Sequence, residues 1–142
     1  MNEAKPAKRL LRGSFRLIMT AMVLLAAALI CRAEALDGTK WRIKVVPDKA
    51  AADKGKKEFD DELIFAHGKF TSTALLKKGF KPSKYIGDVE PNEAEFEVAQ
   101  VSEKAGAVTW LGEIRGTNTM GRLQWTQKDG GKLSYEFTGT KE

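Results

Sequence analysis

A single histidine, a nearby serine and a run of acids are the residues of this sequence that suggest acid–base or nucleophilic chemistry. Ser72 lies five positions after His67, and Asp60, Asp61 and Glu62 precede both. A serine nucleophile would need His67 beside it with an acid orienting the ring, and a pair of carboxylates could hydrolyse a glycosidic bond. No Gly-x-Ser-x-Gly elbow accompanies them.

The elements predicted around these residues argue against both reactions. Glu58 to Leu76 has the pattern of a hairpin with His67-Gly68 as a two-residue turn, which pairs Phe65 with Phe70 and Leu63 with Ser72. The first turn position needs a positive φ angle, which histidine tolerates better than branched residues do. We therefore expect a turn residue rather than a haem ligand, a metal ligand or a catalytic base.

Adjacent acids in a strand point to opposite faces, so Asp61 alone of the three acids is expected to share the inward face. No phosphate loop, dinucleotide fingerprint or zinc motif occurs. The sequence predicts no catalytic residues, no metal site, no cofactor and no enzymatic activity.

A second acidic row, Glu93, Glu95 and Glu97, alternates with apolar residues from Ala94 to Val98. The apolar residues are expected to face inward and the acids outward. Such a row could bind calcium only if neighbouring strands add ligands, and otherwise it is a solvated sheet face that resists aggregation. We expect the solvated face.

The first 35 residues have the pattern of a cleaved secretory signal peptide. Five basic residues precede an apolar run from Leu17 to Ile30, which is too short for a comfortable membrane span. Ala33, Glu34 and Ala35 give the small-x-small pattern of a cleavage site, so residues 36–142 are predicted to form one mature domain. The alternative is a lipid anchor through Cys31.

Export is expected to place the domain in the periplasm or outside the cell, with no stable membrane span after cleavage. The formal net charge of +5 resides largely in the leader, because the mature chain has 18 basic and 17 acidic residues, a net of +1. This balance gives no indication of nucleic-acid binding. Without Cys31 the mature domain has no cysteine, which excludes disulfides and thiolate metal sites.

The last third of the chain, Ala107 to Thr140, is predicted to form three antiparallel strands. A turn at Gly116-Thr117 would pair Trp110 with Leu123, Val108 with Trp125 and Gly112 with Gly121. A second turn at Lys128 to Gly130 would pair Trp125 with Leu133 and Leu123 with Tyr135. The large apolar residues of all three strands then share one face.

The rest of the mature chain adds further strands. Trp41, Ile43 and Val45 alternate along a strand that ends at Pro47. Residues 47–57 are predicted to be a solvated loop with one helical turn over 50–54. Residues 77–88 are predicted to be loop or a poorly formed strand, with Phe80 and Tyr85 docked on the barrel end.

Eight strands are predicted near residues 40–46, 58–66, 69–76, 84–89, 93–101, 107–115, 118–127 and 131–139, the fourth being the weakest. Sequential short strands with turns between them predict an all-β fold, an eight-stranded antiparallel up-and-down barrel, with a two-sheet β-sandwich as the alternative.

Gly38 and Trp41 on the first strand, the long loop after it and the glycine-rich closing hairpins with Trp125 resemble the calycins, the superfamily of lipocalin-like and avidin-like barrels. The resemblance covers nearly all of the mature chain and is architectural. It implies an eight-stranded barrel.

Two functions fit this fold. The first is non-catalytic binding of a small apolar or amphipathic ligand inside the barrel. The residues expected to contact it are aromatic: Phe65, Phe70, Phe96, Trp110, Trp125 and Tyr135. Ser72, Gly112 and Gly121 would leave space, although the rings could equally fill the interior, and the glycines could instead let the sheet bend.

The second function is a protein-interaction module, such as a periplasmic hydrolase inhibitor, that acts on an exported protein through the loops at 47–57 and 77–87.

Overall fold

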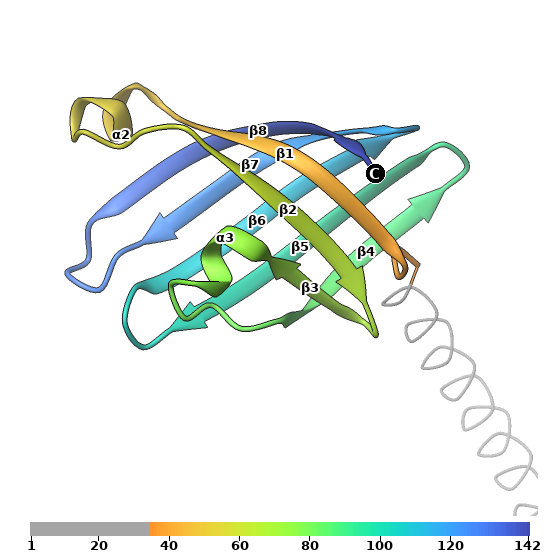
Figure 1. Ribbon diagram of the computed structural model, residues 1–142, viewed down its shortest axis with the longest axis horizontal. Coiled ribbons are helices and arrows are strands. Elements are labelled where there is room, and N and C mark those ends of the chain that lie inside the picture. Colours follow the sequence, from red (N-terminus) through yellow and green to blue (C-terminus); the bar gives the residue numbers. More distant parts are fainter. Residues whose placement is uncertain (1–34) are drawn as a thin grey trace, which may run out of the picture. The chain divides into compact units, whose positions relative to one another are not determined.

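The computed structural model describes residues 35–142. Residues 1–34 of the predicted leader, among them Cys31, lie outside this range. The described part contains eight strands and two short helices (Figure 1). The strands are β1 (Thr39–Pro47), β2 (Phe59–Ala66), β3 (Lys69–Ser72), β4 (Ser83–Glu90), β5 (Glu93–Ser102), β6 (Gly106–Arg115), β7 (Asn118–Thr126) and β8 (Lys132–Lys141). The helices are α2 (Lys49–Asp53) and α3 (Thr73–Leu76).

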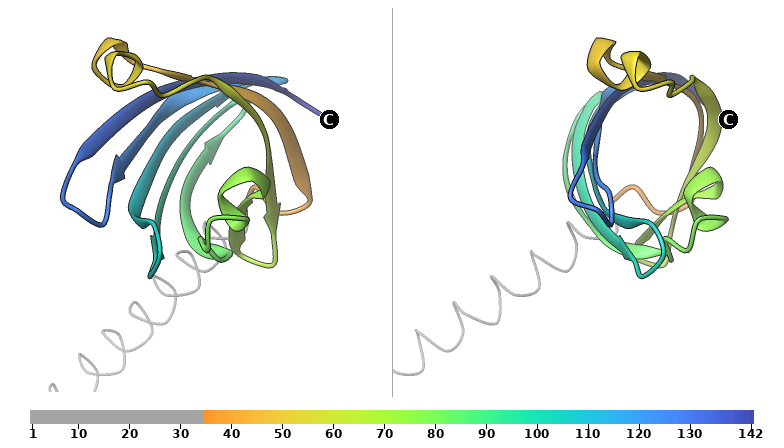
Figure 2. Two further views of the ribbon diagram at one scale, coloured as in Figure 1. Left: turned by 60° about the vertical axis from the view of Figure 1, so that its left-hand side comes forward. Right: turned by 90° about the vertical axis from the view of Figure 1, so that its left-hand side faces the viewer.

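The strands form one closed antiparallel barrel in which each strand pairs with its neighbours in the sequence. β8 returns to pair with β1, so the sheet surrounds a single interior (Figure 2). The predicted up-and-down barrel is confirmed, and the sandwich alternative is wrong because the strands belong to one sheet. Closure removes the exposed strand edges that an all-β domain would otherwise present.

The predicted registers of β6, β7 and β8 are confirmed. Trp110 pairs with Leu123 and Val108 with Trp125 across the first hairpin, and Leu123 pairs with Tyr135 across the second. Gly130 has the positive φ expected of the three-residue loop between β7 and β8. Turn chemistry and side-chain alternation specify the same register here, which explains why the prediction succeeds.

The hairpin of β2 and β3 also has the predicted register, with Phe65 opposite Phe70 and Leu63 opposite Ser72. His67 and Gly68 have φ angles of 54° and 71°, as a two-residue turn of this kind requires. His67 is exposed at the tip of this turn.

The third strand is shorter than predicted. It ends at Ser72, and the residues expected to extend it to position 76 form the helix α3. The Ser72 hydroxyl caps this helix by accepting a hydrogen bond from the Leu75 amide, 3.1 Å away. Serine is a preferred residue at such a cap, and the following Thr-Ala-Leu-Leu can adopt helix as readily as strand.

The fourth strand, predicted to be weak, is regular over eight residues and pairs with β5 from Tyr85 to Glu90. This strand places Tyr85 inside the barrel, so its expected position at the barrel end is wrong. Phe80 is fully buried at the barrel end, as expected, and its ring packs at 87° to the Trp125 ring. The helical turn after β1 is confirmed as α2, which is capped by the Asp48 carboxylate.

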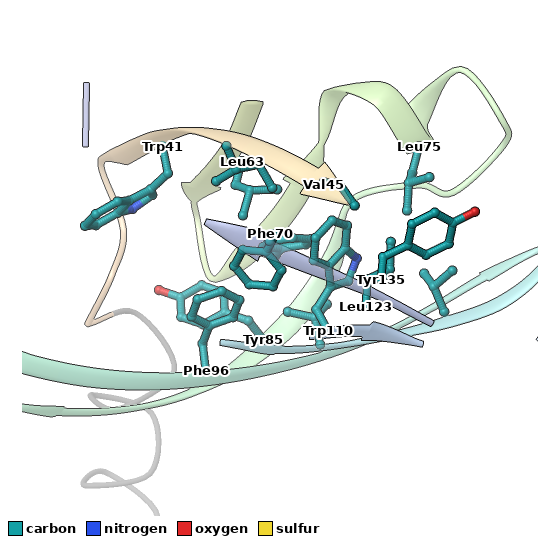
Figure 3. Packing of buried hydrophobic residues seen from close by; sticks show 14 of the residues in the cluster. Trp41, Val45, Leu63, Phe70, Leu75, Tyr85, Phe96, Trp110, Leu123 and Tyr135 are labelled. Carbon is teal, nitrogen blue, oxygen red and sulfur yellow. The ribbon is translucent and has the colours of Figure 1, made fainter. Parts of the chain in front are cut away.

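Alternating residues of all eight strands fill the interior (Figure 3). The predicted inward residues of β1 and β5 are buried, and the three glutamates of β5 lie on the outer face. Each buried ring or branched aliphatic side chain contributes about 1.5 to 3 kcal/mol to folding. The barrel is therefore stabilised by its own core.

Candidate functional site

Four of the six aromatic residues predicted to contact a ligand, Phe65, Phe70, Phe96 and Trp110, lie together inside the barrel and are linked by ring contacts. Phe65 is central, because its ring lies 5.3 Å from Phe70, 4.9 Å from Tyr85 and 5.1 Å from Phe96. Phe70 also packs on Trp110, whose ring centroid is 5.3 Å away (Figure 3). These rings interlock in edge-on and tilted contacts and occupy the middle of the barrel.

Tyr135, the fifth predicted residue, is buried towards the barrel end that carries α2. Its ring packs edge-on against Phe59 at 6.0 Å. Burial, together with the nearby Asp48 carboxylate, raises the pKa of the Tyr135 phenol above its ordinary value of 10.0. The hydroxyl is therefore a neutral group at physiological pH.

The space beside Gly112 and Gly121 is occupied by two phenylalanine rings. A Cβ atom on Gly112 would lie 2.1 Å from the Phe96 ring, and one on Gly121 would lie 2.7 Å from the Phe137 ring. The four residues are directly opposite one another on β5, β6, β7 and β8. Glycine is required here because it lets the rings lie against the backbone.

Four of the buried polar residues, Asp61, Ser72, Gln100 and Ser102, lie inside the barrel; the sequence predicted that Asp61 and Ser72 face inward, but it assigned nothing to Gln100 and Ser102. The Gln100 amide accepts from the indole of Trp110 at 3.1 Å and donates to the Lys81 carbonyl at 2.9 Å. Ser102 donates to the Lys78 carbonyl at 2.8 Å. These contacts tie the β3–β4 connection to the interior face of β5.

Asp61 and Ser72 form a hydrogen-bonded pair at the start of α3. Ser72 donates to the Asp61 carboxylate, which also accepts from the Glu62 amide at 2.7 Å and the Ala74 amide at 2.9 Å. Burial raises the pKa of Asp61 above 3.8, although these hydrogen bonds act in the opposite direction. The pair holds α3 against β2 where β3 has already ended.

No part of this arrangement matches the serine–histidine–acid geometry considered for catalysis. Ser72 contacts Asp61 directly, whereas His67 occupies the β2–β3 turn. Within residues 35–142, no three His, Cys, Asp or Glu side chains lie close enough together to hold a metal ion.

The sixth predicted residue, Trp125, is half-buried and packs against the buried cluster near the end of β7. The helices α2 and α3 lie in connections at this end of the barrel (Figure 1). We call this the lysine-rich end, defined by the four connections 48–58, 73–82, 103–105 and 127–131. These connections contain nine lysines and five acidic residues, a net charge of +4. The turns at the opposite end, 67–68, 91–92 and 116–117, contain no lysine.

The lysine-rich end has a hollow of about 530 Å³ beside Trp125. One lysine from each of the four connections lines it, and the remaining lining comes from Trp125 of β7 and from the connections 103–105 and 127–131. The lining residues are Lys56, Lys78, Lys104, Ala105, Trp125, Gln127, Lys128 and Asp129. All four lysines are exposed.

Trp125 is fixed in this hollow from several sides. Its indole nitrogen donates to the Ala105 carbonyl at 2.7 Å, and its ring packs on Phe80 with the centroids 5.5 Å apart. The Lys78 ammonium lies 5.9 Å from the ring centroid, within the range of a cation–π contact. The half-buried ring thus presents an apolar surface surrounded by positive charge.

The connections around the hollow are held by hydrogen bonds that sequence reasoning did not foresee. The Lys128 ammonium donates to the Glu103 carbonyl, and the Lys54 ammonium donates to the Lys132 carbonyl at 3.4 Å. The sequence did indicate the loops at 47–57 and 77–87 as a candidate binding surface. Lys104 and Lys128, from the two short connections, lie beside these loops only because of the barrel topology.

The described residues form no helix that is both long and apolar enough to cross a membrane. No protein-family model matches the chain, and no curated protein or solved structure matches it at a significant level. The eight-stranded antiparallel closed barrel is consistent with a calycin-like architecture.

Proposed function

We propose that this protein is a non-catalytic interaction module that binds an acidic segment of an exported protein at its lysine-rich end. The observation that carries the proposal is the convergence of four lysines from four connections around the half-buried ring of Trp125. The resemblance to calycins belongs to the same proposal, because small periplasmic barrels of this size include inhibitors of proteases and of lysozyme.

The chemistry of the hollow favours an anionic partner with an apolar component. Lysine ammonium groups attract carboxylates, and they do so strongly enough to matter when several act together. A tryptophan at the centre of a charged rim is a frequent hot spot of binding interfaces, because its large ring is buried when the partner docks. A hollow of about 530 Å³ accommodates two or three side chains of such a segment.

The packing of the interior supports the lysine-rich end as the binding surface in preference to the barrel cavity. The inward rings contact one another at centroid distances near 5 Å, and the phenylalanines cover the two glycines that would have left space. Binding of a ligand among these rings would require them to separate. The ligand inside the barrel stays a prediction.

The test is a titration of the full chain with a poly-glutamate peptide, followed by tryptophan fluorescence. Trp41 and Trp110 are buried, so a change in emission reports on Trp125. Replacing Lys56, Lys78, Lys104 and Lys128 by glutamine should weaken binding about tenfold at low salt, because each exposed charge contributes about 0.3 to 0.5 kcal/mol.

A matched variant controls for total charge. Replacing Lys40, Lys44, Lys69 and Lys84, which are exposed on β1, β3 and β4, removes the same number of charges from the outer face. This variant should bind within about twofold of the wild type. Equal losses in the two variants would refute a site at the lysine-rich end.

A further inference from the structure

A second hollow, of about 790 Å³, lies on the outer face of the sheet over β4 to β8. Its floor is the backbone of Phe96, Gly112, Gly121 and Phe137, a row of directly opposed residues. The two phenylalanines of this row point inward and the two glycines have no side chain, so the row places no side chain on the outer face. The hollow is therefore bounded by the two outward-facing rows on either side.

The first of these rows carries two large apolar side chains among charged ones. Ile86 and Leu111 are its large apolar members, and they are 74% and 44% exposed. Met120, across the floor in the second row, is 52% exposed. The members of the first row, in order from β4 to β8, are Ile86, Glu97, Leu111, Arg122 and Glu136.

The second row forms an acidic wall. Glu95 lies directly opposite Asp88 on one side and Glu113 on the other, so three carboxylates stand in line across β4, β5 and β6. Like charges that are directly opposed in a sheet destabilise it. The lining of the hollow contains five carboxylates and a single cation, Arg122, which gives a formal charge of −4.

We propose that this hollow, the acidic groove, docks an extended cationic and amphipathic segment of a partner protein. A segment that lies across the strands sends alternate side chains to opposite walls. Its apolar side chains would contact Ile86 and Leu111, and its lysines or arginines would reach Asp88, Glu95 and Glu113. Five strands about 4.8 Å apart span about 19 Å, the length of roughly six extended residues.

The acidic groove and the lysine-rich end are separate surfaces of opposite charge. The groove is lined by the middle of β4 to β8, and no residue lines both hollows. The two proposals can therefore fail independently. A second copy that docks its lysine-rich end into the groove is the competing occupant, and the experiment distinguishes it.

The test uses the full chain and a fluorescently labelled six-residue peptide of alternating lysine and leucine, with affinity measured by anisotropy. Replacing Glu95 and Glu113 together by glutamine should weaken binding about fivefold at low salt, and the difference should shrink at high salt. Leu111→Gln, which removes one of the proposed apolar contacts, should weaken binding about threefold. A peptide of alternating lysine and serine should bind more weakly than the leucine peptide to the wild type.

Two controls make the result decisive. The Glu58→Gln and Glu103→Gln double variant removes two exposed carboxylates outside the groove and should leave the affinity unchanged. The Glu95 and Glu113 variant should melt near the wild-type temperature, because the relief of like-charge repulsion is offset by the loss of the exposed ion pair between Glu113 and Arg115, 3.8 Å apart. Unchanged affinity in this folded variant would overturn the proposal.

Sedimentation velocity of the protein alone tests the competing occupant. Self-association that is abolished both by the Glu95 and Glu113 variant and by the four-lysine variant would assign the groove to a second copy and overturn the proposal. A monomeric wild type that binds the lysine–leucine peptide supports a partner segment. The four-lysine variant should bind this peptide as well as the wild type does.

Discussion

Asp61 is a carboxylate with 6% exposure that accepts hydrogen bonds from one side chain and two backbone amides. Desolvation of its charged form outweighs these hydrogen bonds and raises its pKa in the folded state. Between the unfolded value near 3.8 and the raised folded value, the folded protein binds more protons than the unfolded chain. The contribution of Asp61 to stability is therefore greatest at low pH and falls as the pH rises.

Asp61→Asn should reveal this dependence in urea unfolding between pH 3 and 7. The variant loses a hydrogen-bond acceptor for Ser72, a cost of about 1 kcal/mol that does not vary with pH. The free energy of unfolding of the wild type should fall relative to that of the variant as the pH rises through the folded pKa of Asp61.

Asp60→Asn is the matched control, because it removes an exposed carboxylate from the neighbouring position. It should not reproduce the pH-dependent difference. A wild type that gains stability over Asp61→Asn with rising pH would contradict the raised pKa.

At the scale of elements, the glycine pair Gly112 and Gly121 on β6 and β7 leaves no room for a side chain. Gly112→Ala would place a methyl group 2.1 Å from the end of the Phe96 ring, and Gly121→Ala would place one 2.0 Å from the Leu111 carbonyl oxygen. Both should lower the free energy of unfolding by about 1 to 3 kcal/mol or more, as measured by urea denaturation.

The two sites should differ in their response to a second mutation. Phe96→Leu should restore part of the stability lost in Gly112→Ala, since a shorter side chain clears the added methyl. Phe137→Leu should not rescue Gly121→Ala, because the closest obstacle there is backbone. Equal rescue at both positions would show that the strands move apart to accommodate the added methyl group, so that the backbone near Gly121 is not a fixed obstacle.

The hairpins were predictable from sequence because local turn chemistry and alternation agree over β2–β3 and β6–β8. The replacement of the second half of β3 by α3 was not, because it depends on Asp61 of β2 accepting from the Ala74 amide thirteen residues away. Tyr85 was predicted at the barrel end because two glycines and a proline near it suggested a loop. Pairing with β5, a contact that the local sequence does not show, makes the segment a strand.

The two hollows were beyond sequence reasoning in different ways. Glu93, Glu95 and Glu97 were recognised as an outer row, but the addition of Asp88 and Glu113 beside Glu95 comes from the registers of β4 and β6. Trp125 was expected among the interior rings because of its parity. Its ring does pack against the interior cluster, but it also lines the hollow where β7 reaches the barrel end, among lysines that four separate connections supply.

For the whole molecule, the packed interior leads to the prediction that the purified protein carries no bound ligand. Protein purified from its own host under non-denaturing conditions should give a native mass equal to that of the polypeptide, with or without the predicted processing before Leu36. The interlocked rings around Phe65 leave a ligand no place unless they separate. Native mass spectrometry measures this directly.

The same preparation under denaturing conditions supplies the reference mass. A stable additional mass that is present only in the native spectrum would favour a carrier and count against the proposed binding at the surface. A lipid attached through Cys31 would instead appear in both spectra.

The pairing of β1 with β8 also sets the time for which β1 lacks its second partner while the chain is being synthesised. Partners such as Arg42 and Thr140 are separated by nearly the whole domain, so β1 has only one neighbour until the last strand has been made. At about 5 to 20 residues per second, synthesis of the intervening chain takes about 5 to 20 seconds. Throughout that interval one edge of β1 is open to other chains, and the charges of Arg42 and Lys44 on its outer face protect it from aggregation.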